Sequence, residues 1–213
     1  MIPDDDDVEA MTELAERLDI VAVERIGAEL DKLLAVPDPG DALLLLHSTG
    51  LLARVFPRLS GVLDDGDHAP LRAVVVVDPA DHVGRMAAIA WWDVGDRSTS
   101  GVREWGKHLR LRNSDTAAIA SIVSGVAALR GLVGDTPSLR RWAFEVGSER
   151  ERALALGRRV DHDAAHAVSD ALIELASTED LDEPGIPLDG AQVMKALGIG
   201  PGPQVGAAMN HLR

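Results

Sequence analysis

The sequence of 213 residues contains no cysteine and no tyrosine, and aromatic residues make up only 3% of it. Without cysteine, the chain can form no disulfide, no thiolate metal site and no thiol nucleophile. With so few aromatic rings, its core must be built from leucine, alanine, valine and isoleucine. No apolar run approaches the roughly 18 residues of a membrane span, and the acidic start MIPDDDD is unlike a signal peptide. We therefore expect a soluble, cytoplasmic protein.

The formal net charge is −14, but the charged residues are unevenly distributed. Residues 1–20 carry a net charge of −7 and residues 161–190 a net charge of −9. Between them, residues 101–160 contain 11 Lys and Arg against 6 Asp and Glu. A basic middle between acidic flanks is compatible with local phosphate binding. On charge alone, a solvated surface of arginine-rich helices is an equally good interpretation.

Apolar residues recur at helical spacing through much of the chain, and the loops between these segments are short. In the segment after Val23 the pattern is clear, and Pro37 ends it. Residues 74–77 are four consecutive valines. Taken alone they would suit a buried strand, but a lone strand has no partner in a helical chain. We assign them to a helix. The predicted fold class is all-α, a multi-helix array of short helical hairpins.

The last 28 residues, IPLDGAQVMKALGIGPGPQVGAAMNHLR, predict two helices joined by a tight turn. Asp189 is placed to cap the first helix, Gly198 to end it in a left-handed conformation, and Pro203 to start the second. Gly198, Gly200 and Gly202 leave backbone N–H groups uncovered near a helix start, where a phosphate could bind. The alternative is a helical hairpin that only packs on the rest of the protein.

Three stretches resemble one known family. ERIGAELDKLLAVPDPGDALLLLHSTGLLARVFPRL resembles the RNA-binding segment that follows the catalytic region of bacterial CCA-adding enzymes and poly(A) polymerases. WGKHLRLRNSDTAAIASIV is similar to a later helix pair of that family, and PLDGAQVMKALGIGPGPQVGAAM to its tail. The three stretches follow the family's order but cover only its C-terminal half.

The resemblance implies a neck at residues 1–60, a body at 61–180 with a degenerate HD-like region, and a tail hairpin at 181–213. It also implies tRNA as partner, held by its acceptor and T arms. The family's catalytic head, with its Gly-Gly-x-Val-Arg-Asp-like loop and Asp-x-Asp metal pair, is absent here. We therefore expect no catalytic residues and no cofactor in this chain. Mg²⁺ and nucleoside triphosphates would belong to a head domain, in another chain or lost to truncation, and this chain alone would be inactive.

In many relatives a metal-binding His-Asp pair lies in the body. The corresponding stretch here, AIAWWDVGD, has Trp92 where the histidine would stand, and tryptophan cannot bind a metal. We expect Asp93 to lie at a helix end or on the surface.

The basic middle is the predicted RNA-binding site. Arg103, Lys107 and Arg110 are spaced to share one helix face, with Trp105 close enough to stack on a base. We expect about half of the arginines to pair with nearby carboxylates, namely Glu104, Glu145, Glu149 and Glu151, and the rest to form one concave wall. The predicted RNA-binding residues are Arg103, Trp105, Lys107, Arg110, Arg112, Arg140, Arg141, Arg158, Arg159, Gly198, Gly200 and Gly202.

Two alternatives stay open at this point. His162, His166 and Asp170 fall at i, i+4 and i+8, so they could share a helix face and bind zinc, although no fourth ligand can be identified. An exposed polar helix face explains them as well. The second alternative is a non-catalytic helical interaction protein that has lost RNA binding, which the net charge of −14 favours.

Overall fold

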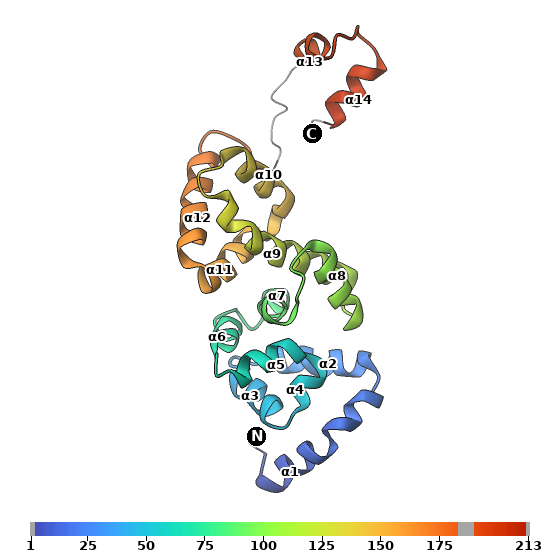
Figure 1. Cartoon of the computed structure of the whole chain (residues 1–213), viewed down its shortest axis with the longest axis vertical. Coiled ribbons are helices and arrows are strands. Elements are labelled where there is room, and N and C mark those ends of the chain that lie inside the picture. The colour runs from blue at the N-terminus through green and yellow to red at the C-terminus, as the bar shows by residue number, and fades with distance from the viewer. Residues whose placement is uncertain (1–2, 183–189, 212–213) are drawn as a thin grey trace.

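The computed structural model describes residues 3–182 and 190–211, and every regular element in these two ranges is helical. Figure 1 shows the N-terminal helices at one end of the molecule and α9 to α12 further along it. The predicted all-α fold class is confirmed. Residues 74–77 form the end of a helix and the turn after it, and no strand occurs in the two described ranges.

The N-terminal part consists of short helices with tight connections. Its last helix runs across residue 60, where the sequence predicted the neck to end. The elements are α1 (Asp5–Leu14), the 3-10 helix η1 (Ala15–Ile20), α2 (Val23–Leu34), α3 (Gly40–Ser48), α4 (Leu51–Val55) and α5 (Pro57–Asp64).

The central part packs around one long helix, α9, which contacts five other helices. Its elements are α6 (Ala69–Val75), α7 (His82–Asp93), α8 (Thr99–His108), α9 (Asn113–Leu132), α10 (Thr136–Val146), the 3-10 helix η2 (Gly147–Glu149), α11 (Arg150–Val160) and α12 (His162–Ala176). A single cluster of buried apolar residues runs from Leu30 in α2 to Leu175 in α12. Residues of the predicted neck and body therefore share one core.

α9 has the length and the apolar composition of a membrane-spanning helix, contrary to the expectation from the sequence. Half of its most apolar window is buried inside the protein, however, and helices pack on it from several sides. The core helix of a globular fold has the same composition, because it is apolar nearly all round.

A fully buried arginine connects the end of α2 to the end of α6. Arg85, on α7, has no exposed surface and donates hydrogen bonds to the carbonyl oxygens of Leu34 (2.6 Å), Val36 (2.5 Å), Pro37 (3.0 Å) and Val77 (2.8 Å). The last carbonyls of a helix have no partner within it and carry partial negative charge. The guanidinium satisfies such carbonyls at or just beyond two helix ends, and so fixes α7 between them.

The C-terminal hairpin consists of α13 (Gly190–Leu197) and α14 (Pro203–His211), which pack on each other (Figure 1). Gly198 has a φ of 65°, so α13 ends in the predicted left-handed conformation, and Pro203 begins α14 as predicted. The predicted capping residue Asp189 lies outside the described residues.

Candidate nucleic-acid interface

Three of the predicted RNA-binding arginines have carboxylate partners. The hydrogen bonds between Arg140 and Glu179 lower the pKa of the glutamate and raise that of the arginine. All three arginine side chains are still partly exposed, so these pairs add little stability. The pairs are Arg110–Glu24 (3.8 Å), Arg112–Asp115 (2.9 Å) and Arg140–Glu179 (2.6 Å).

Other arginines of the basic middle are paired as well. Arg130 bonds to Asp161 and Arg150 to Asp182, while Arg152 contacts two carboxylates. Glu149, one of the four glutamates expected to neutralise arginines, does so by pairing with Arg152 at 2.8 Å. Most of the actual partners are aspartates far away in the sequence, which helical spacing cannot reveal.

The remaining predicted cations, Arg103, Lys107, Arg141, Arg158 and Arg159, form no ion pair with any described residue. They lie on three helices. α8 packs on the first half of α9, where Gly106 faces Thr116, and α11 packs on the second half, where Gly157 faces Leu129. Arg103 and Lys107 on α8 thus lie near one end of α9, and Arg158 and Arg159 on α11 near the other.

Trp105 is used for packing within the protein. Its indole N–H donates to Asp93 Oδ2 at 2.8 Å, and its ring stacks on Phe56 with the centroids 6.1 Å apart. These contacts account for the orientation of Trp105 without a nucleic-acid base. They hold α8 against the start of α5.

Asp93 lies at the centre of the junction between α5, α7 and α8. Its Oδ1 accepts from the backbone N–H groups of Arg58 (3.0 Å) and Leu59 (3.2 Å) in the first turn of α5. Its Oδ2 accepts from Trp105. Asp93 lies at a helix end, as expected, and it is buried, with 6% of its surface exposed. The carboxylate that metal chemistry would have used caps a neighbouring helix instead.

Two arginines that the sequence analysis missed meet at the same junction. A Cβ atom at Gly95 would lie 2.7 Å from Arg58 Cζ, so the Arg58 guanidinium rests on the loop after α7. Arg97 follows in that loop; its Cζ lies 4.2 Å from the centre of the Trp91 ring, and its Nε donates to the Trp91 carbonyl oxygen at 2.9 Å. Burial, and the nearby charge of Arg58, lower the pKa of Arg97.

No carboxylate among the described residues forms an ion pair with Arg58 or Arg97. Asp96, the adjacent acid, accepts instead from the backbone N–H and the hydroxyl of Ser98, which lowers its pKa. Two like charges held together without a counter-ion attract an anion. Neither arginine belongs to a periodic pattern, but Arg58 lies in the first of the three stretches that resemble the polymerase family.

Residues 3–62 match the protein family described as "Probable RNA and SrmB- binding site of polymerase A". This match fits the C-terminal, RNA-binding part of the poly(A) and CCA polymerase family. The resemblance stated from the sequence is thereby confirmed. No curated protein and no solved structure matches the chain.

The matched segment, residues 3–62, is acidic, with 13 Asp and Glu against 5 Lys and Arg. Two of the five cations are paired: Lys32 with Glu29, and Arg54 with Asp19 and Glu16. Arg58 is unpaired and lies beside a second arginine. Arg17 and Arg25 also form no ion pair with a described residue, so what distinguishes Arg58 is the charge of Arg97 beside it.

The tail glycines are open to approach. A side chain at Gly198, Gly200 or Gly202 would meet no other atom within 4 Å. The turn between α13 and α14 thus has the exposed backbone that the sequence predicted. Open space is a property of any exposed turn, so it does not by itself identify a phosphate site.

The histidine pair does not gather a metal-binding set. The rings of His162 and His166 pack edge to face with their centroids 5.3 Å apart, and His162 faces Asp163 at 3.4 Å. Among the described residues no group of three or more His, Asp or Glu side chains could hold a metal ion, so Asp170 does not complete the site.

Arg110 has an unusual backbone. Its φ is 56°, in the left-handed region that favours glycine, and the N–H of Leu111 bonds back to the Gly106 carbonyl oxygen to close α8. A non-glycine residue in this conformation costs of the order of 1 kcal/mol. Arg110 thus occupies the helix end where glycine would be least strained.

Proposed function

We propose that this chain is the tRNA-binding portion of a cytoplasmic CCA-adding tRNA nucleotidyltransferase. It holds the acceptor and T arms so that a catalytic head domain, outside these 213 residues, can extend the 3′ end. Mg²⁺ and nucleoside triphosphates would bind that head. The residues of this chain contribute position and charge to the reaction, and no chemical step.

One observation carries the proposal: the uncompensated pair Arg58 and Arg97, at the end of the segment that matches an RNA-binding family. Arginine binds phosphate through a planar fork of donors. The Trp91 ring fixes the Arg97 guanidinium, and the backbone of Gly95 supports that of Arg58. The side chains are thus ordered before RNA arrives, which lowers the entropic cost of binding.

The exposed residues Arg103 and Lys107 share one face of α8, whose first residue, Thr99, follows Arg97 by two positions. They extend the positive charge away from the junction. Contacts of this kind recognise the backbone and its shape, not the base sequence. Such recognition suits a surface that must accept every tRNA.

The test is a tRNA gel shift over a range of salt concentrations with the double variant Arg58→Gln/Arg97→Gln. Loss of two phosphate contacts is expected to weaken binding about tenfold or more and to reduce the salt slope by about two. The matched control is Arg54→Gln, which removes a charge already neutralised within the same segment. It should bind tRNA nearly as well as the wild type.

A second RNA tests the tRNA assignment. A minihelix of acceptor and T arms should compete with whole tRNA, whereas an RNA hairpin of equal length without the T loop should compete weakly. Equal competition by both would leave RNA binding in place and contradict tRNA selection.

The alternative is a helical interaction protein without RNA binding. It is favoured by the net charge of −14 and by the pairing of so many arginines. In that case no shift is seen with any RNA, even at low salt.

A further inference from the structure

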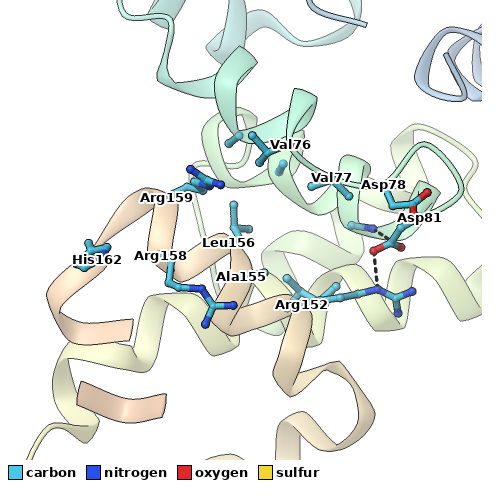
Figure 2. Close-up of a pocket in the computed structure, with 14 residues that line it drawn as sticks. Val76, Val77, Asp78, Asp81, Arg152, Ala155, Leu156, Arg158, Arg159 and His162 are labelled. Carbon is cyan, nitrogen blue, oxygen red and sulfur yellow. Dashed lines mark hydrogen bonds and ion pairs between the residues drawn. The ribbon is translucent and has the colours of Figure 1, made fainter. Parts of the chain in front are cut away.

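A cavity lined by residues of α6, α7 and α11 is separate from the Arg58–Arg97 junction. It measures about 500 Å³ and lies between the α6–α7 region and α11 (Figure 2). Pockets for small molecules typically have volumes of roughly 300–1,000 Å³. The cavity combines an apolar wall with four charged or titratable side chains of α11 and the start of α12, namely Arg152, Arg158, Arg159 and His162.

The acidic residues of the cavity are already engaged. Asp81 accepts from Arg152 Nε at 2.9 Å through Oδ2 and from the Gly84 N–H at 3.0 Å through Oδ1. Arg152 also bonds to Glu149 at 2.8 Å, and these hydrogen bonds raise its pKa. Asp78 accepts from the Ala80 N–H at 2.8 Å. The charge of Arg152 is therefore balanced within the protein.

Arg158 and Arg159 have no such balance, since neither forms an ion pair with a described residue. Both are exposed and line the cavity. In Figure 2, Arg159 lies on the side of Val76 and Arg158 on the side of Arg152. The part of the cavity formed by Arg158 and Arg159 therefore carries unbalanced positive charge. The ligand should carry negative charge where it meets these two residues.

The wall beside these arginines is apolar and accessible. Val76 is 52% exposed although its side chain lines the cavity, and Ala155 is exposed there as well. Val77, which is partly exposed, continues this lining, and the buried residues Ala88, Ile122 and Leu156 lie beneath it. A flat ring that covers this wall would remove apolar surface from water.

We infer that this cavity binds a nucleoside phosphate, with the phosphate at Arg158 and Arg159 and the base against the Val76–Leu156 wall. Asp78 uses one carboxylate oxygen in its turn, which leaves the other to accept from a sugar hydroxyl or a base amino group. The ligand is either a free nucleotide or the terminal nucleotide of an RNA strand. The inference stands independently of the proposed function, because it uses none of the residues of the Arg58–Arg97 junction.

The experiment is calorimetric titration of the full chain with adenosine monophosphate, with adenosine and inorganic phosphate as partial ligands. The double variant Arg158→Gln/Arg159→Gln is expected to weaken nucleotide binding by about tenfold or more, because charge-assisted hydrogen bonds are lost. The single variants Arg158→Gln and Arg159→Gln show which of the two contributes more. The matched control Arg17→Gln removes an exposed arginine that forms no ion pair with a described residue and lies outside the cavity, and it should leave binding unchanged.

A second variant tests the apolar wall. Ala155→Phe fills the cavity from an exposed position and leaves every charge in place, so it should weaken nucleotide binding and spare inorganic phosphate. Competition by an RNA oligonucleotide would identify the strand end as the source of the ligand, and its absence would identify a free nucleotide. No binding of adenosine monophosphate at millimolar concentration, or equal binding by the double variant, would overturn the inference.

Discussion

Two helices of similar length, α1 with 10 residues and α7 with 12, are stabilised in opposite ways. α1 has no buried residue; the Asp4 side chain accepts from the Asp7 N–H at 2.9 Å, and three acids occupy its first turn. α7 buries seven residues, among them Arg85 and Asp93. Arg85 and Asp93 of α7 bond to residues 34, 36, 58 and 59 of the matched segment. The packing of that segment therefore depends on a helix outside the family match.

The largest effect is expected where α7 holds two helix ends. Arg85→Ala leaves the buried carbonyl oxygen of Leu34 and the partly buried ones of Val36, Pro37 and Val77 without this donor, and it opens a cavity. We expect a loss of about 3–5 kcal/mol in the free energy of unfolding, measured by urea denaturation.

Arg72→Ala is the matched control, because Arg72 is an exposed arginine on the neighbouring α6. It should change stability by less than about 0.5 kcal/mol. Arg85→Met separates volume from hydrogen bonding, since methionine fills much of the space and donates nothing. Wild-type stability in Arg85→Met would contradict the role given to the guanidinium.

A smaller loss is expected at the other end of α7. Asp93→Ala removes the acceptor of two backbone N–H groups in α5 and of the Trp105 indole, at a cost of about 2–4 kcal/mol by urea denaturation. Asp93→Asn retains an oxygen for the α5 groups and loses the indole bond, so about half of that loss is expected. Equal damage by both variants would mean that the negative charge, not the acceptor geometry, holds the junction.

The smallest effect is expected at α1. Asp4→Ala removes an N-cap, and we expect faster hydrogen exchange in α1 with a change below about 0.5 kcal/mol in global stability, since few contacts connect α1 to the core. Asp81→Ala is the counterpart, an N-cap on α7 whose loss should lower global stability by about 1–2 kcal/mol. Similar global losses in the two variants would remove the contrast between the helices.

Local patterns in the sequence predicted the helical elements well. The proline after α2, the left-handed Gly198 and the start of α14 at Pro203 all depend on the backbone preferences of a few neighbouring residues. The residues that join elements could not be predicted. Arg85 is separated from Leu34 by 51 positions and Asp93 from Arg58 by 35, and nothing near either residue indicates its partner.

The candidate nucleic-acid interface likewise combines features that local spacing predicts with contacts that only the packed fold creates. Helical spacing correctly placed Arg103 and Lys107 on one helix, but the prediction that Arg110 shares their helix face was wrong, because α8 ends at His108 and Arg110 is left-handed. Charge pairing across the fold decides which arginines are free to bind. Arg112 and Arg140 are engaged by Asp115 and Glu179, while Arg58 and Arg97 become neighbours only when α5 packs against α7. Exposure also differs between neighbours on one helix, since Trp142 is buried while Phe144 is 47% exposed.

The carboxylate of Asp81 serves two elements at once, capping α7 through one oxygen and anchoring Arg152 through the other. The carboxylate lies over Gly84, where a methyl group would collide with it. One side of the neighbouring cavity is therefore formed by the capped first turn of α7. A ligand in that cavity therefore meets a side that is formed before it binds, and that side changes only if the first turn of α7 unwinds.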